Sequence, residues 1–535
     1  MPNSFNLLTQ PWLPCVDQQD RLKIMSLHDV MIQAHTLKTL RADLPIITSS
    51  LYLFLIAFTS AVFKPADDDE WEDLWNKGAF PPEVIQAYQD KWQGRFDLFD
   101  VRHPFYQDPQ LGRRQKDLKA LKKGQAPIPK GISSLLLHLA SGSNATLFNH
   151  SMDEHPQRYS PAEAARILIM LQAYSLGGMT SASVPTDKYY KDSPFGRGVM
   201  FISCGSNLFQ TLMLNMVPKD FDSGIRDAKD TPSWEQEDPF ENEVSSLAGL
   251  CDLLSWQSRR LLLLPETEDG EISARNCLTA PGVKLPETLK NPYYHIRYEK
   301  KESQISLKPL RFQVGHALWR DSAAILDVNS DESDVPLPIK WFQYLLIQGI
   351  LPKKEIHLEL FGICTEPGQK KAYFYAWQSF IAPAIFLEKP NLLVQLKGGL
   401  AWAEDVRKTL YFSSSDLASF YLSYLQDCSD GKKPDPKDVA ALISAFSTEE
   451  YYWSSLEPAF YAYLTNLPVS AEAHQVWQQA LRDAARSSLN NASEMVGTNP
   501  PGLKARAKAC QKLEYGMYQI FKPTDEGANN GEHAK

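Results

Sequence analysis

The chain has 535 residues, of which 43% are hydrophobic and 11% aromatic, and it carries a formal net charge of −9. This length exceeds what one compact core usually supports, so we expect two or more domains, and the apolar content excludes a largely disordered chain. The acidic balance argues against a globally basic nucleic-acid coat, although a local basic patch depends on how the charges are distributed.

The cysteines and the N-terminal residues indicate the cellular compartment in which the protein is expected. Seven cysteines are scattered along the chain without a Cys-x-x-Cys pair, at positions 15, 204, 251, 277, 364, 428 and 510. We therefore expect reduced thiols and a cytoplasmic location. The opening MPNSFNLLTQPWLP has no basic stretch followed by an apolar core, so we expect no signal peptide.

Residues 44–63 form the most apolar segment, with twenty residues and no charge. That length satisfies the requirement for a membrane span and would suit a membrane-anchored scaffold. Arg41, Asp43 and Lys64 lie close by, and five Ser or Thr residues interrupt the segment. A buried helix in a large protein has the same composition, and we favour that interpretation.

Residues 111–130 form a basic run, with seven Lys or Arg against one Asp. One interpretation is a solvated helix face, and the other is a patch that contacts phosphates. The sequence alone does not favour either interpretation over the other.

Farther along, the pattern predicts an α+β N-terminal domain over 1–389 and an all-α C-terminal four-helix bundle over 390–535. Residues 161–176 predict a helix, with Ser160 as its cap and a stop at Gly177-Gly178. Short β-like runs alternate with helices up to about residue 375. After residue 390 the helical segments are expected at 391–427, 436–467, 470–493 and 502–521.

Familiar catalytic motifs are missing from the sequence. It contains no GxxxxGK[ST], GxSxG, HExxH or GxGxxG motif. His150 and His155 are five residues apart in a polar loop, a spacing that does not place both on one helix face, and we interpret them as solvated. We therefore expect that the protein is not an enzyme and needs no cofactor; the alternative is a nuclease or other hydrolase with a dispersed active site.

Three loops combine glycine or bulky apolar side chains with amides: NATLFNH at 144–150, the turn at 177–180, and CTEPGQKK at 364–371. Glycine allows a close backbone approach to a ligand, and apolar or amide side chains can wedge into a DNA minor groove. Taken alone, these residues favour ordinary turns for all three loops.

Ordered motifs along most of the chain resemble the CasA family, the large subunit of the type I-E CRISPR surveillance complex, Cascade. The resemblance rests on FNLLTQPWLP, RFDLFDVRHPFYQ, NATLFNH, AARILIMLQAYSLGG and HLELFGICTEPGQ. It implies a non-catalytic subunit that recognises the protospacer-adjacent motif (PAM) of duplex DNA from the minor groove and promotes R-loop formation. It also implies partners: the other Cascade subunits, the guide RNA, double-stranded target DNA and a helicase-nuclease that docks on this subunit.

The resemblance also implies roles for single residues. The loop that anchors the subunit in the complex matches Leu147, Phe148 and Asn149. The glycine loop that faces the PAM matches Gly178, Met179 and Thr180, with Gly177 directly before it. The wedge that parts the strands falls on Gln369, next to Gly368.

A lysine that reaches into the minor groove is expected in PGVKLPETLK. Lys284 fits best, and Lys290 remains the alternative. Some relatives carry a cysteine-rich metal cluster just before this lysine. Here only Cys251 and Cys277 occur nearby, so we expect no zinc.

Overall fold

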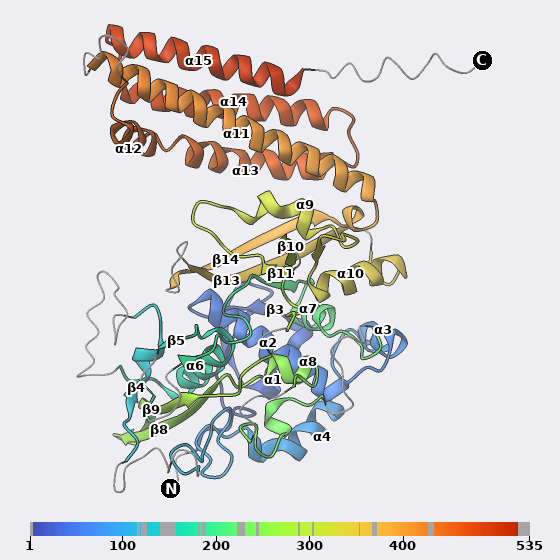
Figure 1. Cartoon of the computed structure of the whole chain (residues 1–535). Coiled ribbons are helices and arrows are strands. Elements are labelled where there is room, and N and C mark those ends of the chain that lie inside the picture. The colour runs from blue at the N-terminus through green and yellow to red at the C-terminus, as the bar shows by residue number, and fades with distance from the viewer. Residues whose placement is uncertain are drawn as a thin grey trace. The chain divides into compact units, whose positions relative to one another are not determined.

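The computed structural model describes residues 4–114, 118, 126–139, 157–179, 182–184, 189–221, 230–241, 246–286, 289–301, 304–352, 354–365, 372–425 and 433–522. The chain divides into two compact units (Figure 1). The first comprises Met1–Leu318, Val328–Pro352 and Ile356–Ile381. The second comprises Trp319–Asp327, Lys353–Glu355 and Ala382–Lys535.

The first unit mixes helices with small sheets. Its helices are α1 (Leu27–Gln33), α2 (Pro45–Phe63), α3 (Asp68–Lys77), α4 (Pro82–Trp92), α6 (Pro161–Tyr174), α7 (Leu208–Asn215), α8 (Leu250–Leu254) and α10 (Leu337–Ile347). The predicted helix at 161–176 is thus present as α6, with Ser160 and Glu163 forming a capping box.

Helix α2 is the core of this unit. It starts with Pro45 in its first turn and ends where Lys64 adopts a left-handed conformation with φ of 44°. Among the described residues it is the one helix long and apolar enough to cross a membrane, yet 83% of its most apolar window is buried inside the protein. The interpretation of residues 44–63 as a buried helix is therefore confirmed.

Aromatic side chains surround the middle of α2. Phe54 and Phe58 both pack against Trp234, with ring centroids 5.5 and 6.4 Å away. Phe54 also meets Phe105 edge-on at 5.7 Å, and Phe58 meets Phe96 at 6.0 Å. Each such pair contributes about 0.5–1.5 kcal/mol beyond its buried area, so this cluster fixes how α2 packs against the loops that follow α4.

In the described residues, the strands form five small sheets. The pairs β1–β2, β1–β3, β4–β9, β5–β6, β7–β13, β8–β9, β10–β11 and β10–β12 are antiparallel. The orders are β2-β1-β3, β11-β10-β12, β14-β13-β7, β4-β9-β8 and β5-β6. Their bounds are β1 (Leu13–Asp17), β2 (Leu22–Met25), β3 (Leu37–Leu40), β4 (Lys130–Gly131), β5 (Gly178–Met179), β6 (Tyr189–Tyr190), β7 (Met200–Ser203), β8 (Arg259–Glu268), β9 (Glu271–Pro281), β10 (Ile296–Lys301), β11 (Gln304–Pro309), β12 (Ser333–Asp334), β13 (Glu355–Thr365) and β14 (Ala372–Pro383).

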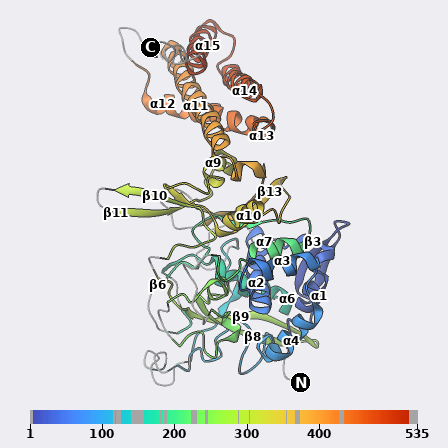
Figure 2. The same cartoon turned by 90° about the vertical axis from the view of Figure 1, so that its right-hand side faces the viewer.

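The second unit is helical. It contains α9 (Ser322–Ile325), α11 (Pro390–Leu425), α12 (Pro436–Phe446), α13 (Thr448–Asn466), α14 (Ala473–Met495) and α15 (Pro500–Phe521). Helices α11, α13, α14 and α15 run side by side in both views (Figures 1 and 2). The mixed fold with a helical C-terminal region is therefore confirmed.

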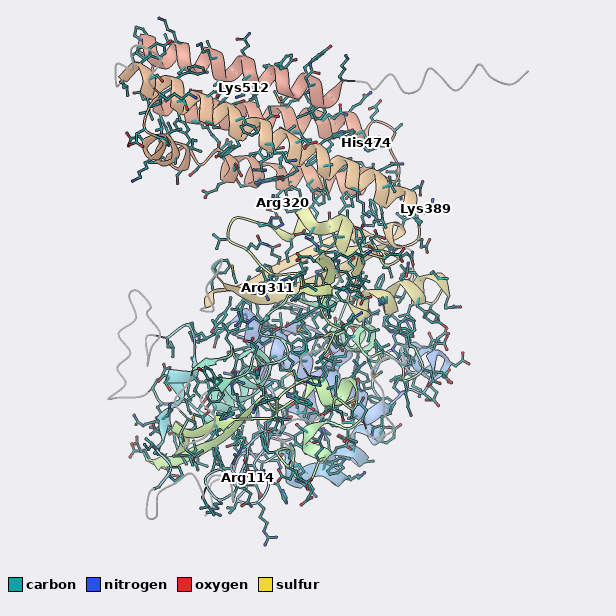
Figure 3. The ribbon with its side chains drawn as sticks, in the orientation of Figure 1. Arg114, Arg311, Arg320, Lys389, His474 and Lys512 are labelled. Atoms are coloured by element: carbon teal, nitrogen blue, oxygen red, sulfur yellow. The ribbon has the colours of Figure 1, made fainter. Side chains whose placement is uncertain are left out.

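Two details of this unit differ from the expected pattern. The segment predicted as one helix at 436–467 is two helices, because Ser447 adopts a left-handed conformation with φ of 47°. The unit also includes Trp319, which lies some 70 residues before the start of α11 in sequence. Its ring stacks on that of Phe460, with the ring centroids 4.5 Å apart. Neighbouring Arg320 lies 3.7 Å over the ring of Trp453, and Figure 3 labels it.

Candidate nucleic-acid interface

The glycine turn at 177–178 is held in place by a hydrogen bond from its backbone to an aspartate side chain. The Gly177 N–H donates to Asp192 Oδ1 at 2.6 Å. A Cβ atom on Gly177 would lie 2.7 Å from the Tyr190 carbonyl oxygen, so a side chain does not fit there. Gly178 has φ of +156° and open space where a Cβ would point. The turn therefore presents bare backbone at Gly178, a feature that permits close approach of another molecule.

The side chain of buried Arg259 binds the backbone next to the turn. The Arg259 guanidinium donates to the carbonyl oxygens of Leu176 at 3.2 Å and Ser258 at 2.9 Å. It also lies 4.9 Å over the ring of Tyr190. Burial lowers the pKa of Arg259 to about 10, which leaves the group charged at neutral pH. A buried positive charge therefore lies at the Leu176 carbonyl, one residue before the turn.

The Lys284 segment is bound to the same stretch of chain. The Gly282 N–H donates to the Ser258 carbonyl at 3.1 Å, and the Val283 N–H donates to the Gln257 carbonyl at 3.2 Å. Lys284 follows directly. Residues 257–259 therefore connect the glycine turn, through the buried guanidinium, to the backbone that carries Lys284. We call this arrangement the 257–259 corner.

Lys290, the alternative lysine, is engaged elsewhere. Its Nζ lies 3.1 Å from Tyr298 Oη and 3.4 Å from Asp334 Oδ2. The hydrogen bond to Tyr298 and the nearby Asp334 raise the pKa of Lys290. A carboxylate partner offsets part of the positive charge that Lys290 could offer to DNA.

The other predicted site residues fall outside what the structure describes. These are Leu147, Phe148, Asn149, Thr180, Gly368 and Gln369. For Met179 the backbone is described, and it pairs with Tyr189. Strand β13 ends at Thr365 and strand β14 begins at Ala372, so residues 366–371 connect the two strands in sequence. The assignments of all six residues stay predictions.

The basic run at 111–130 begins with an arginine that has a structural role. Arg114, labelled in Figure 3, forms ion pairs with Asp238 at 2.6 Å and Asp108 at 3.2 Å. Arg260 binds the same buried Asp108 at 2.6 Å. Arg114 is thus committed to carboxylates, and a phosphate-contacting role does not fit it. Of the lysines at 115–125, none lies in the described residues.

Sequence reasoning missed two groups of residues. For Arg259, the one signal in the sequence is the Arg-Arg pair that stands directly before LLLL. Cys204, His357 and Glu359 were also missed. Within the described ranges they are the one group of three or more metal-ligating side chains whose ligand atoms lie close together. The separation of 153 residues between Cys204 and His357 hides this group from any motif search.

Solved structures of CRISPR-associated proteins share this fold. The crystal structure of Cse1 from Acidimicrobium ferrooxidans has a TM-score of 0.80 and 22% identity, and the match covers 97% of this chain and 99% of that chain. Thermobifida fusca Cse1 has a TM-score of 0.76 and 23% identity, with 97% and 98% covered. The fold is therefore that of the Cse1 structures.

The sequence comparisons identify the family. A CasA/Cse1 protein of Thermus thermophilus is 27% identical over 521 residues, which are 95% of this chain and 96% of the relative. The family model described as CRISPR-associated protein Cse1 matches residues 6–488. The chain belongs to the CRISPR-associated Cse1 family, and the resemblance seen in its motifs is confirmed.

Proposed function

We propose that this chain is the large, non-catalytic subunit of a cytoplasmic type I-E CRISPR surveillance complex. In this role it recognises the PAM of double-stranded DNA from the minor groove and promotes strand separation and R-loop formation with the guide RNA. It also provides the surface on which a helicase-nuclease docks. Its partners are the other Cascade subunits, the guide RNA and the target DNA.

Family membership supports the place of the chain in such a complex. Two chains from structures of a CRISPR RNA-guided surveillance complex share its fold, with TM-scores of 0.72 and 0.66. The second structure is described as pre-nicking. Each match covers at least 96% of this chain, so the proposal applies to the chain as a whole.

The 257–259 corner is the observation that carries the DNA-binding part of the proposal. It holds an open glycine backbone, a buried guanidinium and the Lys284 segment together through hydrogen bonds. The minor groove is narrow and electronegative, so bare backbone and long cationic side chains are suited to enter it. Minor-groove recognition is degenerate, which fits a subunit that accepts several PAM sequences.

The loop with Leu147 and Phe148 is proposed as the anchor in the complex, since bulky apolar side chains in a polar loop are typical of interface anchors. Gln369 is proposed as the wedge that stabilises parted strands.

The test is a binding assay with a PAM library. The complex is reconstituted with and without this chain, and bound duplexes are sequenced. Enrichment of a few PAM sequences that requires this chain would support the proposal. Equal retention of all library members would contradict it. The competing hydrolase hypothesis is tested with the isolated chain, which should leave DNA intact in the presence of Mg²⁺ or Mn²⁺.

A further inference from the structure

Three potential metal ligands meet where β7 and β13 pair. In this antiparallel ladder Ser203 lies opposite Leu358, and Ile202 lies opposite Glu359. The Cys204 N–H donates to the His357 carbonyl at 2.8 Å, which places Cys204 across from His357. Glu359 shares a strand face with His357, because alternate residues of a strand point the same way. The sheet register therefore sets the three side chains beside one another.

The distances suit a single ion. The ligand atoms of Cys204, His357 and Glu359 all lie within 4.8 Å of one another. Zinc bonds of about 2.0–2.3 Å place tetrahedral ligand atoms about 3.5 Å apart. Small side-chain rotations on a fixed backbone are enough to close that difference.

The chemistry of the three groups points to zinc. Thiolate, imidazole and carboxylate are the three ligand types that zinc takes from proteins, and three protein ligands leave one position for water or another donor. His357 Nε2 lies 3.0 Å from Ser379 Oγ on β14. Trp377, also on β14, hydrogen-bonds the Glu359 carboxyl. Outer partners of this kind orient ligands in known metal sites.

A thiol and a carboxyl lose their protons when they bind a metal, so metal binding at this site is expected to release protons and to weaken as the pH falls.

We propose that Cys204, His357 and Glu359 bind one zinc ion that links β7 to β13. This site does not depend on the proposed DNA-binding function. It differs from the expectation of no zinc, which rested on the few cysteines near Lys284.

The test uses the full-length chain with any affinity tag removed. Zinc content is measured by mass spectrometry after dialysis, and affinity is measured by competition with a chromophoric chelator. Co²⁺ then replaces Zn²⁺, because a thiolate ligand gives a near-ultraviolet charge-transfer band. We expect one ion per chain and a cobalt band that requires Cys204.

Cys204→Ser should abolish the band, while His357→Gln and Glu359→Gln should each weaken the affinity about tenfold or more. The control is Cys510→Ser, which removes another partly accessible thiol and should leave binding unchanged. Should Cys204→Ser fail to fold, the other two variants carry the test. Absence of bound metal in the wild type, or a band that survives Cys204→Ser, would overturn the proposal.

Discussion

The Arg259 guanidinium binds the Leu176 carbonyl at 3.2 Å, one residue before the Gly177-Gly178 pair. This bond connects the start of β8 to the turn that follows α6, two segments more than 80 residues apart in sequence. The turn therefore depends on a side chain that does not belong to it. Any role of the turn in DNA recognition should depend on Arg259 as well.

Replacing Arg259 with Met should destabilise the protein and weaken PAM-dependent binding. The substitution leaves the Leu176 carbonyl without this buried donor, while the Ser258 carbonyl keeps the Gly282 N–H. An unsatisfied buried carbonyl costs about 1–3 kcal/mol. Urea unfolding measures this loss. The control is Arg275→Met on the same hairpin, where the ion pairs with Glu266 and Glu268 are partly exposed and contribute less than about 1 kcal/mol. Equal losses in both variants would show that Arg259 has no special role.

Alanine substitutions at two adjacent glycines of α11 should change the stability of the protein in opposite directions. A Cβ atom on Gly399 would lie 2.4 Å from Tyr463 Oη, whereas a Cβ atom on Gly398 would meet nothing within 4 Å. Gly399→Ala should therefore cost about 1–3 kcal/mol. Gly398→Ala should stabilise by roughly 0.5–1 kcal/mol, because alanine loses less entropy in a helix.

Thermal melting of the two variants measures these shifts. The Gly399 carbonyl also accepts a hydrogen bond from Trp477 Nε1 at 2.8 Å, so the tryptophan should report any movement of α14. If the two variants melt at the same temperature, that result would contradict the close packing of α11 against α13 and α14 at Gly399.

The ion pair between Arg486 and Glu514 should make part of the stability of the second unit pH-dependent. Two hydrogen bonds of 2.6 and 2.8 Å join α14 to α15. The bond from Arg486 lowers the pKa of Glu514. A carboxyl with a lowered folded pKa stabilises the fold above its unfolded pKa of about 4.3, and loses this effect as the pH falls through the folded value.

Wild type should therefore exceed Glu514→Gln in stability at pH 7, and the difference should vanish well below pH 4. Both side chains are more than 40% exposed, so solvent screening limits the effect to about 0.2–1 kcal/mol. Asp483→Asn is the matched control, since Asp483 lies 3.7 Å from the same arginine. A difference that persists at low pH would contradict this assignment.

The sequence predicted local structure better than it predicted the site. Residues 44–63 could be recognised as a buried helix from their composition, and Ser160 marked the start of α6. No local signal predicted the break at Ser447, because serine rarely adopts a left-handed conformation. Nor could a pattern reveal that Trp319 packs with the C-terminal helices, or that Arg114 pairs with Asp108 and Asp238.

Long-range register explains what the sequence missed at the site. The 257–259 corner joins residues from three separate segments, and Cys204 meets His357 only through the pairing of β7 with β13. Such contacts are set by tertiary folding and leave no spacing to recognise. The family motifs supplied Gly178 and Lys284, but the support from Arg259 required the structure.

Gln369→Ala, with Gly368 retained, should impair R-loop formation on closed linear DNA. Unstacking a base step costs a few kcal/mol, and an inserted side chain offsets part of that cost. A target already unpaired beside the PAM, or one that is negatively supercoiled, should restore most of the yield. R-loop yield on closed, bubbled and supercoiled targets measures this. Equal defects on closed and bubbled DNA would rule out the wedge.

The central claim is that the corner with Lys284 recognises the PAM, and one comparison tests it most directly. The reconstituted complex, carrying wild type, Lys284→Ala or Lys290→Ala, is bound to a duplex PAM library, and enrichment is read by sequencing. Losing a charged hydrogen bond of about 1.5–3 kcal/mol corresponds to roughly tenfold or more in affinity. We predict that Lys284→Ala loses PAM enrichment by that factor, while Lys290→Ala, whose amine pairs with Asp334, keeps it. Wild-type enrichment in Lys284→Ala would contradict the account.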